Sequence, residues 1–227
     1  MPKRLLFVMT SRAELGESGV PTGVWLEELA MPYRLCAEAG CEIGFATPEG
    51  RPAPLDPQSL VAPSLWPAGQ WFLDQPGLSR MLETPVDMRT VEAESLDGLY
   101  LVGGTGTLWD FPRCHALGAL VSDLHASGKP VAAICHGVAG LLAAHAPDGG
   151  PFVRGKRLTA FSNAEEIEAG CDALVPILVE TALVEQGAFY RSSPPFQPMV
   201  VVDGLLVTGQ NPASAPELSE KLLQLLR

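Results

Sequence analysis

The sequence predicts an α/β domain whose mostly parallel sheet is covered by helices on both faces. Runs of apolar, β-branched residues alternate with helical patterns along most of the chain, as is typical of parallel strands joined by crossover helices. An Asp203-Gly204 turn between two apolar runs predicts one antiparallel hairpin near the end. With 227 residues, 47% of them apolar, the chain can bury a sizeable core, and we expect a single domain over residues 1–227.

Charge and cysteine content limit the classes of partner and compartment. Fifteen basic against 26 acidic residues give a net charge of −11, which repels phosphate groups and disfavours nucleic acid and membrane partners. The apolar run Leu5–Met9 is too short for a signal peptide and no stretch approaches transmembrane length, so we expect a cytoplasmic protein. The five cysteines form no C-x-x-C pair, which favours reduced thiols, and the Cys and His spacings match no zinc pattern.

A strand, a helix and a second strand open the chain. We expect strands at residues 3–10 and 42–47 and a helix from about 23 to 40. Pro32 lies inside that helix and should kink it or leave a backbone hydrogen bond unmade. The apolar positions define the buried face of this helix but do not fix the orientation of Glu27 and Glu28. One of these two side chains should face inward. We interpret the proline-rich segment from 48 to about 90 as a covering insertion rather than a sheet element.

The middle of the chain carries the candidate nucleophile. A strand at 99–102 and a helix at 114–127 precede the apolar run Val131–Ile134, which ends in Cys135-His136-Gly137 and continues as a helical pattern to Ala143. Such an elbow raises the Cys135 side chain out of the sheet beside the first N–H groups of the helix, whose partial positive charge favours a thiolate. The alternative is that Cys135 is a small buried hydrophobe.

The last third of the chain should add two helices, the hairpin and a closing helix. We expect a short strand at 157–161, helices at 163–169 and 174–186, and the hairpin at 199–208. Pro176 lies near the start of its helix, where proline is tolerated. The sequence Ser214-Ala-Pro-Glu217 predicts a capping box. The closing helix then carries an apolar stripe formed by Leu218, Leu222, Leu225 and Leu226.

The glycines after the strand at 99–102 are candidate elements of an oxyanion site. Ligands of such folds bind at the carboxyl ends of the strands, where Gly103-Gly104 and Cys135 both fall. The N–H groups of Gly104 and His136 can donate to an oxyanion, because glycine permits a close backbone approach. A dinucleotide fingerprint starting at Gly104 is disfavoured, since Trp109 occupies the place of the third glycine.

Only one of the four histidines is placed for catalysis. His115 and His125 fall on the helix at 114–127 and His145 ends the elbow helix, so these three are expected to be structural. No histidine follows position 145, which excludes a papain-like arrangement with a distant downstream histidine. His136 is therefore the expected base, with its ring oriented by a carboxylate from the pair Glu165-Glu166.

Several motifs together make the chain similar to a known superfamily. They are Gly23-Val-Trp-x-x-Glu28 with Pro32-Tyr33, Asp56-Pro-x-Ser59, Gly103-Gly-x-Gly-Thr-x-Trp-Asp110, Ala133-x-Cys-His-Gly137, Leu158-Thr-x-Phe161 with Glu165-Glu166, and Thr208-Gly-Gln-Asn-Pro-Ala-Ser214. Over nearly its whole length the chain resembles the ThiJ/PfpI superfamily. The resemblance is closest to the branch of heat-shock-type chaperones and glutathione-independent glyoxalases.

The resemblance implies a flavodoxin-like three-layer sandwich, usually a homodimer, that converts the small aldehyde methylglyoxal to lactate without a cofactor or metal. Protein-deglycase and holdase activities are also reported in relatives. By the same resemblance, Cys135 is the nucleophile, His136 and Glu166 complete the triad, and Glu28 hydrogen-bonds the thiol. The residues expected around the oxyanion or substrate are Gly104, Thr105, His136, Trp25 and Trp109. Many members have histidine where this chain has Thr105.

The chemistry follows from these residues as an expectation. Burial and like charge should raise the pKa of Glu28, which as a neutral acid can hydrogen-bond a thiolate. The thiolate would attack the aldehyde, and His136 would move the proton between the two carbons. The alternatives are a holdase that uses apolar surface around Trp66 and Trp71, a redox sensor based on oxidation of Cys135, and an amidase or peptidase.

Overall fold

The computed structural model describes residues 1–227 and contains a seven-stranded sheet in the order β3-β2-β1-β4-β5-β9-β8. All neighbouring strands are parallel except β8 and β9, which form the predicted antiparallel hairpin. The strands are β1 (Arg4–Val8), β2 (Glu42–Thr47), β3 (Val86–Asp87), β4 (Gly98–Leu101), β5 (Val131–Ile134), β8 (Val200–Asp203) and β9 (Leu206–Gly209). The central strands β4 and β5 are buried throughout, as their continuous apolar runs require.

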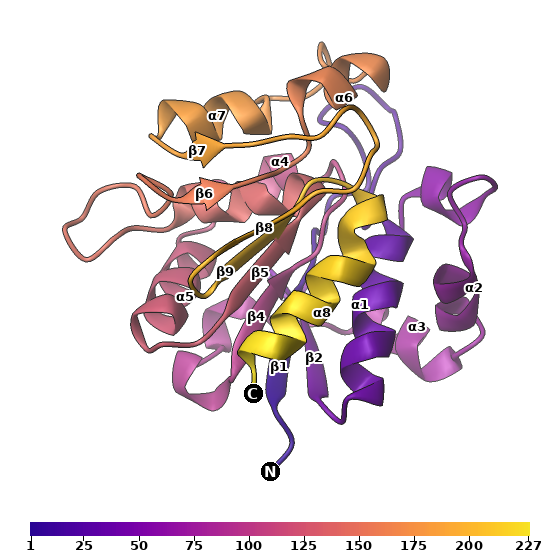
Figure 1. Cartoon of the computed structure of the whole chain (residues 1–227). Coiled ribbons are helices and arrows are strands. Elements are labelled where there is room, and N and C mark those ends of the chain that lie inside the picture. The colour runs from indigo at the N-terminus through magenta and orange to yellow at the C-terminus, as the bar shows by residue number, and fades with distance from the viewer.

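Helices cover both faces of the sheet, so the predicted flavodoxin-like three-layer sandwich is confirmed (Figure 1). Helices α1 (Leu26–Glu38) and α8 (Ala215–Leu225) pack together on one face. On the other face, α5 (His115–Ala126) and α4 (Thr107–Asp110) contact the helix that follows β5. This last segment, Cys135–Ala143, is a 3-10 helix and is called the elbow helix below. No helix of the structure is long and apolar enough to cross a membrane.

The predicted insertion is folded and contributes to the sheet. Helices α2 (Pro67–Leu73) and α3 (Pro76–Glu83) lie outside α1 and each begins with a proline, which supplies the helical φ angle at a position that needs no N–H. The end of the segment adds the edge strand β3, parallel to β2. The prediction that this segment contains no sheet element was therefore wrong at its end.

Three local predictions in the last third of the chain were wrong. The helix expected from 174 begins later, as α7 (Val179–Glu185), because Pro176 disfavours a helical conformation of the residue before it and the chain is still extended at Leu178. The expected strand at 157–161 is only β6 (Arg157–Leu158), and it pairs with β7 (Phe189–Tyr190) in a separate small sheet. The Ser214 hydroxyl does not cap α8; it accepts from the N–H of Met199 at 3.1 Å instead.

Pro32 leaves a backbone carbonyl of α1 without its usual helical donor, and a buried tyrosine donates a hydrogen bond to this carbonyl. Proline has no N–H, so the carbonyl oxygen of Glu28, four residues earlier, has no partner within the helix. The hydroxyl of Tyr100, on β4, donates to this oxygen at 2.8 Å. Tyr100 is fully buried in the core cluster. The bond ties the turn of α1 that carries Glu28 to the centre of the sheet.

We expect Tyr100→Phe to lower the free energy of unfolding by about 1–3 kcal/mol, because the buried carbonyl of Glu28 loses the hydroxyl that donates to it. Urea unfolding monitored by circular dichroism measures the change. Tyr33→Phe is the matched control, since the Tyr33 hydroxyl makes no hydrogen bond and its loss should change stability by less than about 0.5 kcal/mol. Equal effects of the two substitutions would contradict the role given to the Tyr100 hydroxyl.

Candidate active site

The turn after β5 places Cys135 at the carboxyl edge of the sheet. Cys135 has a φ of 55°, a left-handed conformation that non-glycine residues adopt rarely and mostly where a site imposes it. Gly137 makes the turn possible, because a Cβ there would lie 2.6 Å from the carbonyl oxygen of Val102. The predicted strand, turn and helix are therefore present, with the cysteine at the apex. Its side chain is only 4% exposed.

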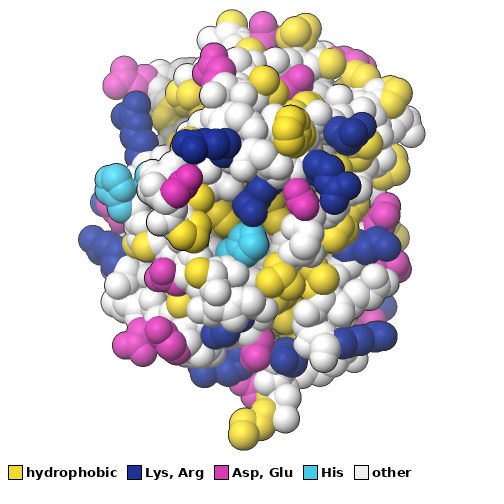
Figure 2. Space-filling model, turned by 60° about the vertical axis from the view of Figure 1, so that its left-hand side comes forward, with side chains coloured by type: hydrophobic (Ala, Val, Ile, Leu, Met, Phe, Trp, Pro, Cys, Tyr) yellow, Lys and Arg dark blue, Asp and Glu magenta, His cyan; other side chains and the backbone are white.

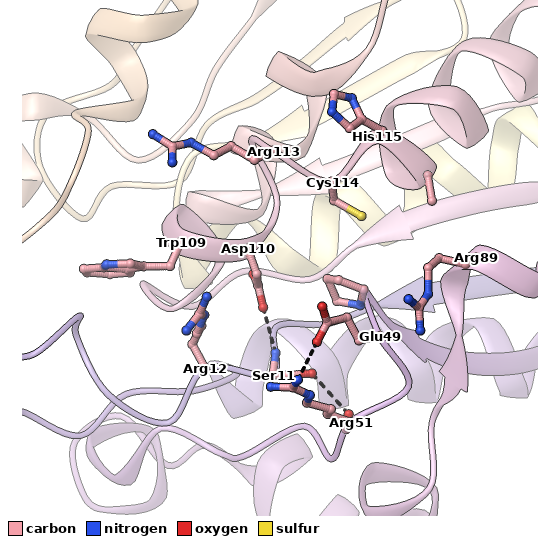
Figure 3. A pocket seen from close by; sticks show the side chains of 12 residues that line it. Ser11, Arg12, Glu49, Arg51, Arg89, Trp109, Asp110, Arg113, Cys114 and His115 are labelled. Atoms are coloured by element: carbon pink, nitrogen blue, oxygen red, sulfur yellow. Dashed lines mark hydrogen bonds and ion pairs between the residues drawn. The ribbon is translucent and has the colours of Figure 1, made fainter.

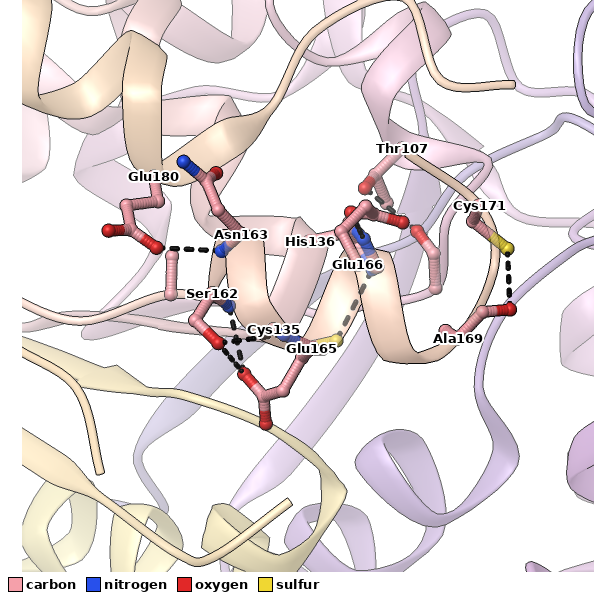
Figure 4. A network of polar contacts seen from close by, with 12 residues as sticks. Thr107, Cys135, His136, Ser162, Asn163, Glu165, Glu166, Ala169, Cys171 and Glu180 are labelled. Carbon is pink, nitrogen blue, oxygen red and sulfur yellow. Dashed lines mark hydrogen bonds and ion pairs between the residues drawn. The ribbon is translucent and has the colours of Figure 1, made fainter. Parts of the chain in front are cut away.

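Cys135, His136 and Glu166 form a connected chain of polar contacts (Figure 4). The Cys135 Sγ lies 3.4 Å from His136 Nδ1, and His136 Nε2 lies 2.8 Å from an oxygen of Glu166. If Nε2 carries the ring proton and donates it to Glu166, Nδ1 has a lone pair that faces the thiol. The arrangement can therefore act as a nucleophile with an adjacent, oriented base.

Helix α6 (Asn163–Glu168) decides between the two adjacent glutamates that the sequence left open. Ser162 caps it in a capping box with Glu165, which turns that side chain back toward the helix start. Glu165 accepts hydrogen bonds from the N–H and hydroxyl of Ser162, both at 2.8 Å. The next residue, Glu166, projects from another side of the helix and reaches His136.

Glu165 also fixes one wall of the site. Its carboxylate accepts from the side-chain amides of Gln210 at 2.9 Å and Asn211 at 2.8 Å, and from the N–H of Phe196 at 2.9 Å. Sequence reasoning placed Gln210 and Asn211 in a motif without a role and did not single out Phe196. The sequence signal for Gln210 and Asn211 is that these two polar residues directly follow the buried strand β9.

Glu28 lies on the other side of Cys135, at the first turn of α1. We expected one of Glu27 and Glu28 to face inward, and the structure buries both. Glu27 accepts from the N–H of Gly69 at 3.0 Å, whereas the carboxyl of Glu28 faces the Cys135 thiol. Glycine is required at position 103, because a Cβ there would collide with the Glu28 carboxylate and come within 2.9 Å of Cys135 Cβ.

Burial dominates the ionisation of this pair. Desolvation raises the pKa of Glu28 to about 8, because neither carboxyl oxygen has a hydrogen-bond partner, and the neighbouring Cys135 thiol lowers it in part. Desolvation and the neighbouring Glu28 carboxylate also raise the pKa of Cys135 well above its usual value, although the N–H of His136 opposes this. The expected thiolate stabilised by the helix start is therefore wrong for the resting site. The two groups share protons as a pair, and a base must deprotonate the thiol.

The cavity above Cys135 has a volume of about 250 Å³ and is mostly apolar. Four of the residues expected around the substrate, Gly104, Thr105, Trp25 and His136, line it. Glu166, Phe161 and Phe196 also line it, and the ring centroids of the two phenylalanines are 6.3 Å apart. The N–H of Gly104 makes no hydrogen bond within the chain, which leaves it free to bind an oxyanion. A Cβ on Gly104 would collide with the carbonyl oxygen of Gly23.

Trp109 does not line this cavity. Its indole packs toward Gly16, where a Cβ would lie 3.2 Å from Trp109 Nε1, and it lines a different cavity. The motif that contains Trp109 continues into α4, so the side chain turns away from Cys135 as the helix begins. No group of three or more His, Cys, Asp or Glu side chains is arranged to hold a metal ion.

Fold and site together define a class of protein: an α/β sandwich with a buried cysteine on a nucleophile elbow, a histidine beside it and a glutamate opposite. The profile of the DJ-1/PfpI family matches residues 20–225. The chain belongs to the DJ-1/PfpI family, as its resemblance to ThiJ/PfpI proteins led us to expect.

Relatives with full-length similarity carry glyoxalase names. The glutathione-independent glyoxalase HSP31 of Saccharomyces cerevisiae is 30% identical over 239 residues, covering 100% of this chain and 99% of that protein. The crystal structure of glyoxalase III from Candida albicans matches with a TM-score of 0.88 at 26% identity, over 99% of this chain and 98% of that one. The 24 kDa rapid encystment protein of Francisella tularensis matches with a TM-score of 0.94 at 35% identity, over 99% of each chain.

We expect Glu28→Gln to lower the pKa of the Cys135 thiol, because the substitution removes the negative charge that the ionised Glu28 carboxylate places beside the thiolate. The rate of iodoacetamide labelling at Cys135, followed by peptide mass spectrometry over pH 6–10, should therefore rise at lower pH than in the wild type.

Glu27→Gln is the matched control, since Glu27 is equally buried but binds Gly69 rather than the thiol. Its labelling profile should coincide with that of the wild type. A profile for Glu28→Gln that is unchanged or moved to higher pH would contradict the electrostatic coupling between Glu28 and Cys135.

Proposed function

We propose that this protein is a cysteine-dependent, cofactor-independent glyoxalase that converts methylglyoxal and related 2-oxoaldehydes to 2-hydroxy acids. The observation that carries the proposal is the contact chain from Cys135 through His136 to Glu166, beside Glu28, at the base of a small and mostly apolar cavity. The full-length similarity to proteins named glutathione-independent glyoxalase supports it. A homodimer stays a prediction for this chain.

The first step joins the cysteine to the aldehyde. His136 Nδ1 takes the thiol proton as Sγ attacks the aldehyde carbon, and the N–H groups of Gly104 and His136 hold the developing oxyanion. Glu166 stabilises the imidazolium that forms. Returning the proton to the oxyanion gives a hemithioacetal.

The next steps move a proton and release the product. His136 removes the proton from the former aldehyde carbon and delivers it to the neighbouring keto carbon, while the hydroxyl proton of the hemithioacetal passes to the keto oxygen. The first carbon is thereby oxidised to a thioester and the second is reduced to an alcohol. Water then cleaves the thioester, which releases the 2-hydroxy acid and restores the thiol. Glu28 has a pKa of about 8 and is protonated at neutral pH. Its carboxyl can therefore donate a hydrogen bond to the sulfur of Cys135 in the steps in which that sulfur is negatively charged.

The structure gives less support to the other functions considered. Trp71 lies with its ring centroid 6.5 Å from that of Tyr33 and beneath the Arg34 guanidinium, and both Trp66 and Trp71 are partly buried, so neither ring is fully exposed for a holdase. On the side of the molecule away from α2, Figure 2 shows acidic and basic side chains interspersed with apolar ones. The raised pKa of Cys135 disfavours a sensor that depends on a low-pKa thiolate. No observation favours an amidase or peptidase over an aldehyde enzyme.

The proposal predicts lactate from methylglyoxal without glutathione or added metal. Cys135→Ala should lower kcat/KM by about a thousandfold or more, since Cys135 is the cavity thiol that contacts the base His136, whereas the Cys171 thiol donates to the carbonyl of Ala169. A lactate assay on purified wild-type and variant proteins measures the change. Cys114→Ala, which alters a thiol in a different cavity, should retain wild-type activity. Full activity in Cys135→Ala would refute the mechanism.

Phe196 should select for the apolar group of the substrate. It lines the cavity with a φ of 59°, and the bond from its N–H to Glu165 holds it in this strained conformation. We expect Phe196→Ala to lower kcat/KM for phenylglyoxal about tenfold or more and to change that for methylglyoxal little, because only the larger group reaches the lost ring. Phe189→Ala, at an exposed aromatic on β7, is the control. Equal losses for both substrates would contradict this role.

A further inference from the structure

A second cavity, of about 420 Å³, opens at the same edge of the sheet and shares no lining residue with the Cys135 cavity (Figure 3). Its walls come from the loops that follow four neighbouring strands, β3, β2, β1 and β4. Strand β2 pairs with one edge of β1, and β4 pairs with the opposite edge of β1. The cavity therefore lies at the point where the strand order reverses, which is where open α/β sheets bind ligands.

Each of these four loops contributes one arginine to the cavity. Arg12 follows β1, Arg51 follows β2, Arg89 follows β3, and Arg113 follows β4 and the short helix α4. Four of the 15 basic residues of a chain with a net charge of −11 thus line one hollow. The four guanidinium groups repel one another, and the two carboxylates that also line the hollow, Glu49 and Asp110, offset this positive charge only in part.

Two of these arginines have no acidic partner. Arg51 pairs with Glu49 at 2.9 Å and Arg89 with Asp87 at 2.6 Å. The side chains of Arg12 and Arg113 make no ion pair or hydrogen bond. Their planar forks are free to bind an oxyanion with two parallel hydrogen bonds.

The backbone around the cavity is held in place by Asp110. One of its oxygens accepts from the hydroxyl of Thr10 and from the N–H of Ser11, both at 2.9 Å, which ties the loop carrying Arg12 to α4 (Figure 3). Residues 114–116 bring the start of the 12-residue helix α5 to the cavity wall. The positive end of that helix adds to the field of the arginines.

We infer that this cavity binds the phosphate group of a small phosphate monoester, such as a sugar phosphate, with Arg12 and Arg113 as the principal ligands. The cavity is larger than a phosphate ion needs, and the indole of Trp109 and the ring of Pro48 supply walls for an organic group. The site is independent of the chemistry at Cys135.

Isothermal titration calorimetry at low ionic strength with glucose 6-phosphate as the probe tests the inference. The wild type should bind it saturably at one site per chain, and Arg12→Ala/Arg113→Ala should weaken the affinity about tenfold or more. The affinity should fall as sodium chloride is added, because salt screens the arginines. Cys135→Ala should bind as the wild type does.

Arg34→Ala/Arg154→Ala is the charge-matched control, since these two arginines lie outside the cavity and should leave the affinity unchanged. Glucose alone should not bind. Equal weakening in both double variants, or no saturable binding of glucose 6-phosphate by the wild type, would overturn the inference. Binding of inorganic phosphate as tight as that of glucose 6-phosphate would overturn the assignment to an ester.

Discussion

The contact between Glu28 and Cys135 is the constraint on which the rest of the site depends. A buried carboxyl and a buried thiol disfavour each other's ionisation, so Glu28 keeps at neutral pH a proton that an exposed glutamate would lose. Several unusual backbone and side-chain features of the chain make this contact possible. Gly103 leaves room for the carboxyl, Pro32 and Tyr100 fix the turn of α1 that carries it, and Cys135 adopts a left-handed backbone to meet it.

Three glutamates near the cysteine perform different tasks because their surroundings differ. Glu28 is desolvated and has the thiol as its polar neighbour, which favours its neutral form at neutral pH. Glu166 faces the imidazole of His136, where a negative charge is useful. Glu165 accepts hydrogen bonds from Ser162, Gln210, Asn211 and Phe196 and so joins three segments of chain. Residue type alone does not distinguish an acid, a positioning group and a structural anchor; the hydrogen-bond partners do.

The sequence predicted the features that follow from local pattern. The apolar run before Cys135 and the small residues after it predicted the elbow, and the Asp203-Gly204 turn predicted the hairpin between β8 and β9. Both signals lie within a few residues of the structure they specify.

Features that depend on distant contacts were not predictable in the same way. The Ser214 hydroxyl could cap α8 or accept a hydrogen bond from a neighbouring segment. The N–H of Met199 lies within reach of this hydroxyl, so the second arrangement forms. The field of the helix start suggested a thiolate at Cys135, but burial and Glu28, which is over 100 residues away in the chain, reverse the direction of the pKa. Trp109 shares a motif with Gly104, yet the first turn of α4 directs it to the other cavity.

The protonation state of Glu28 tests the account most directly. Infrared difference spectra between the wild type and Glu28→Gln isolate the C=O stretch of a protonated carboxyl group at this position. The account predicts that this band is present at pH 6.5 and disappears on titration with a midpoint near the pKa of about 8. A carboxylate signal already at pH 6.5, with no protonated band, would contradict the claim that the site holds a proton on Glu28 beside Cys135.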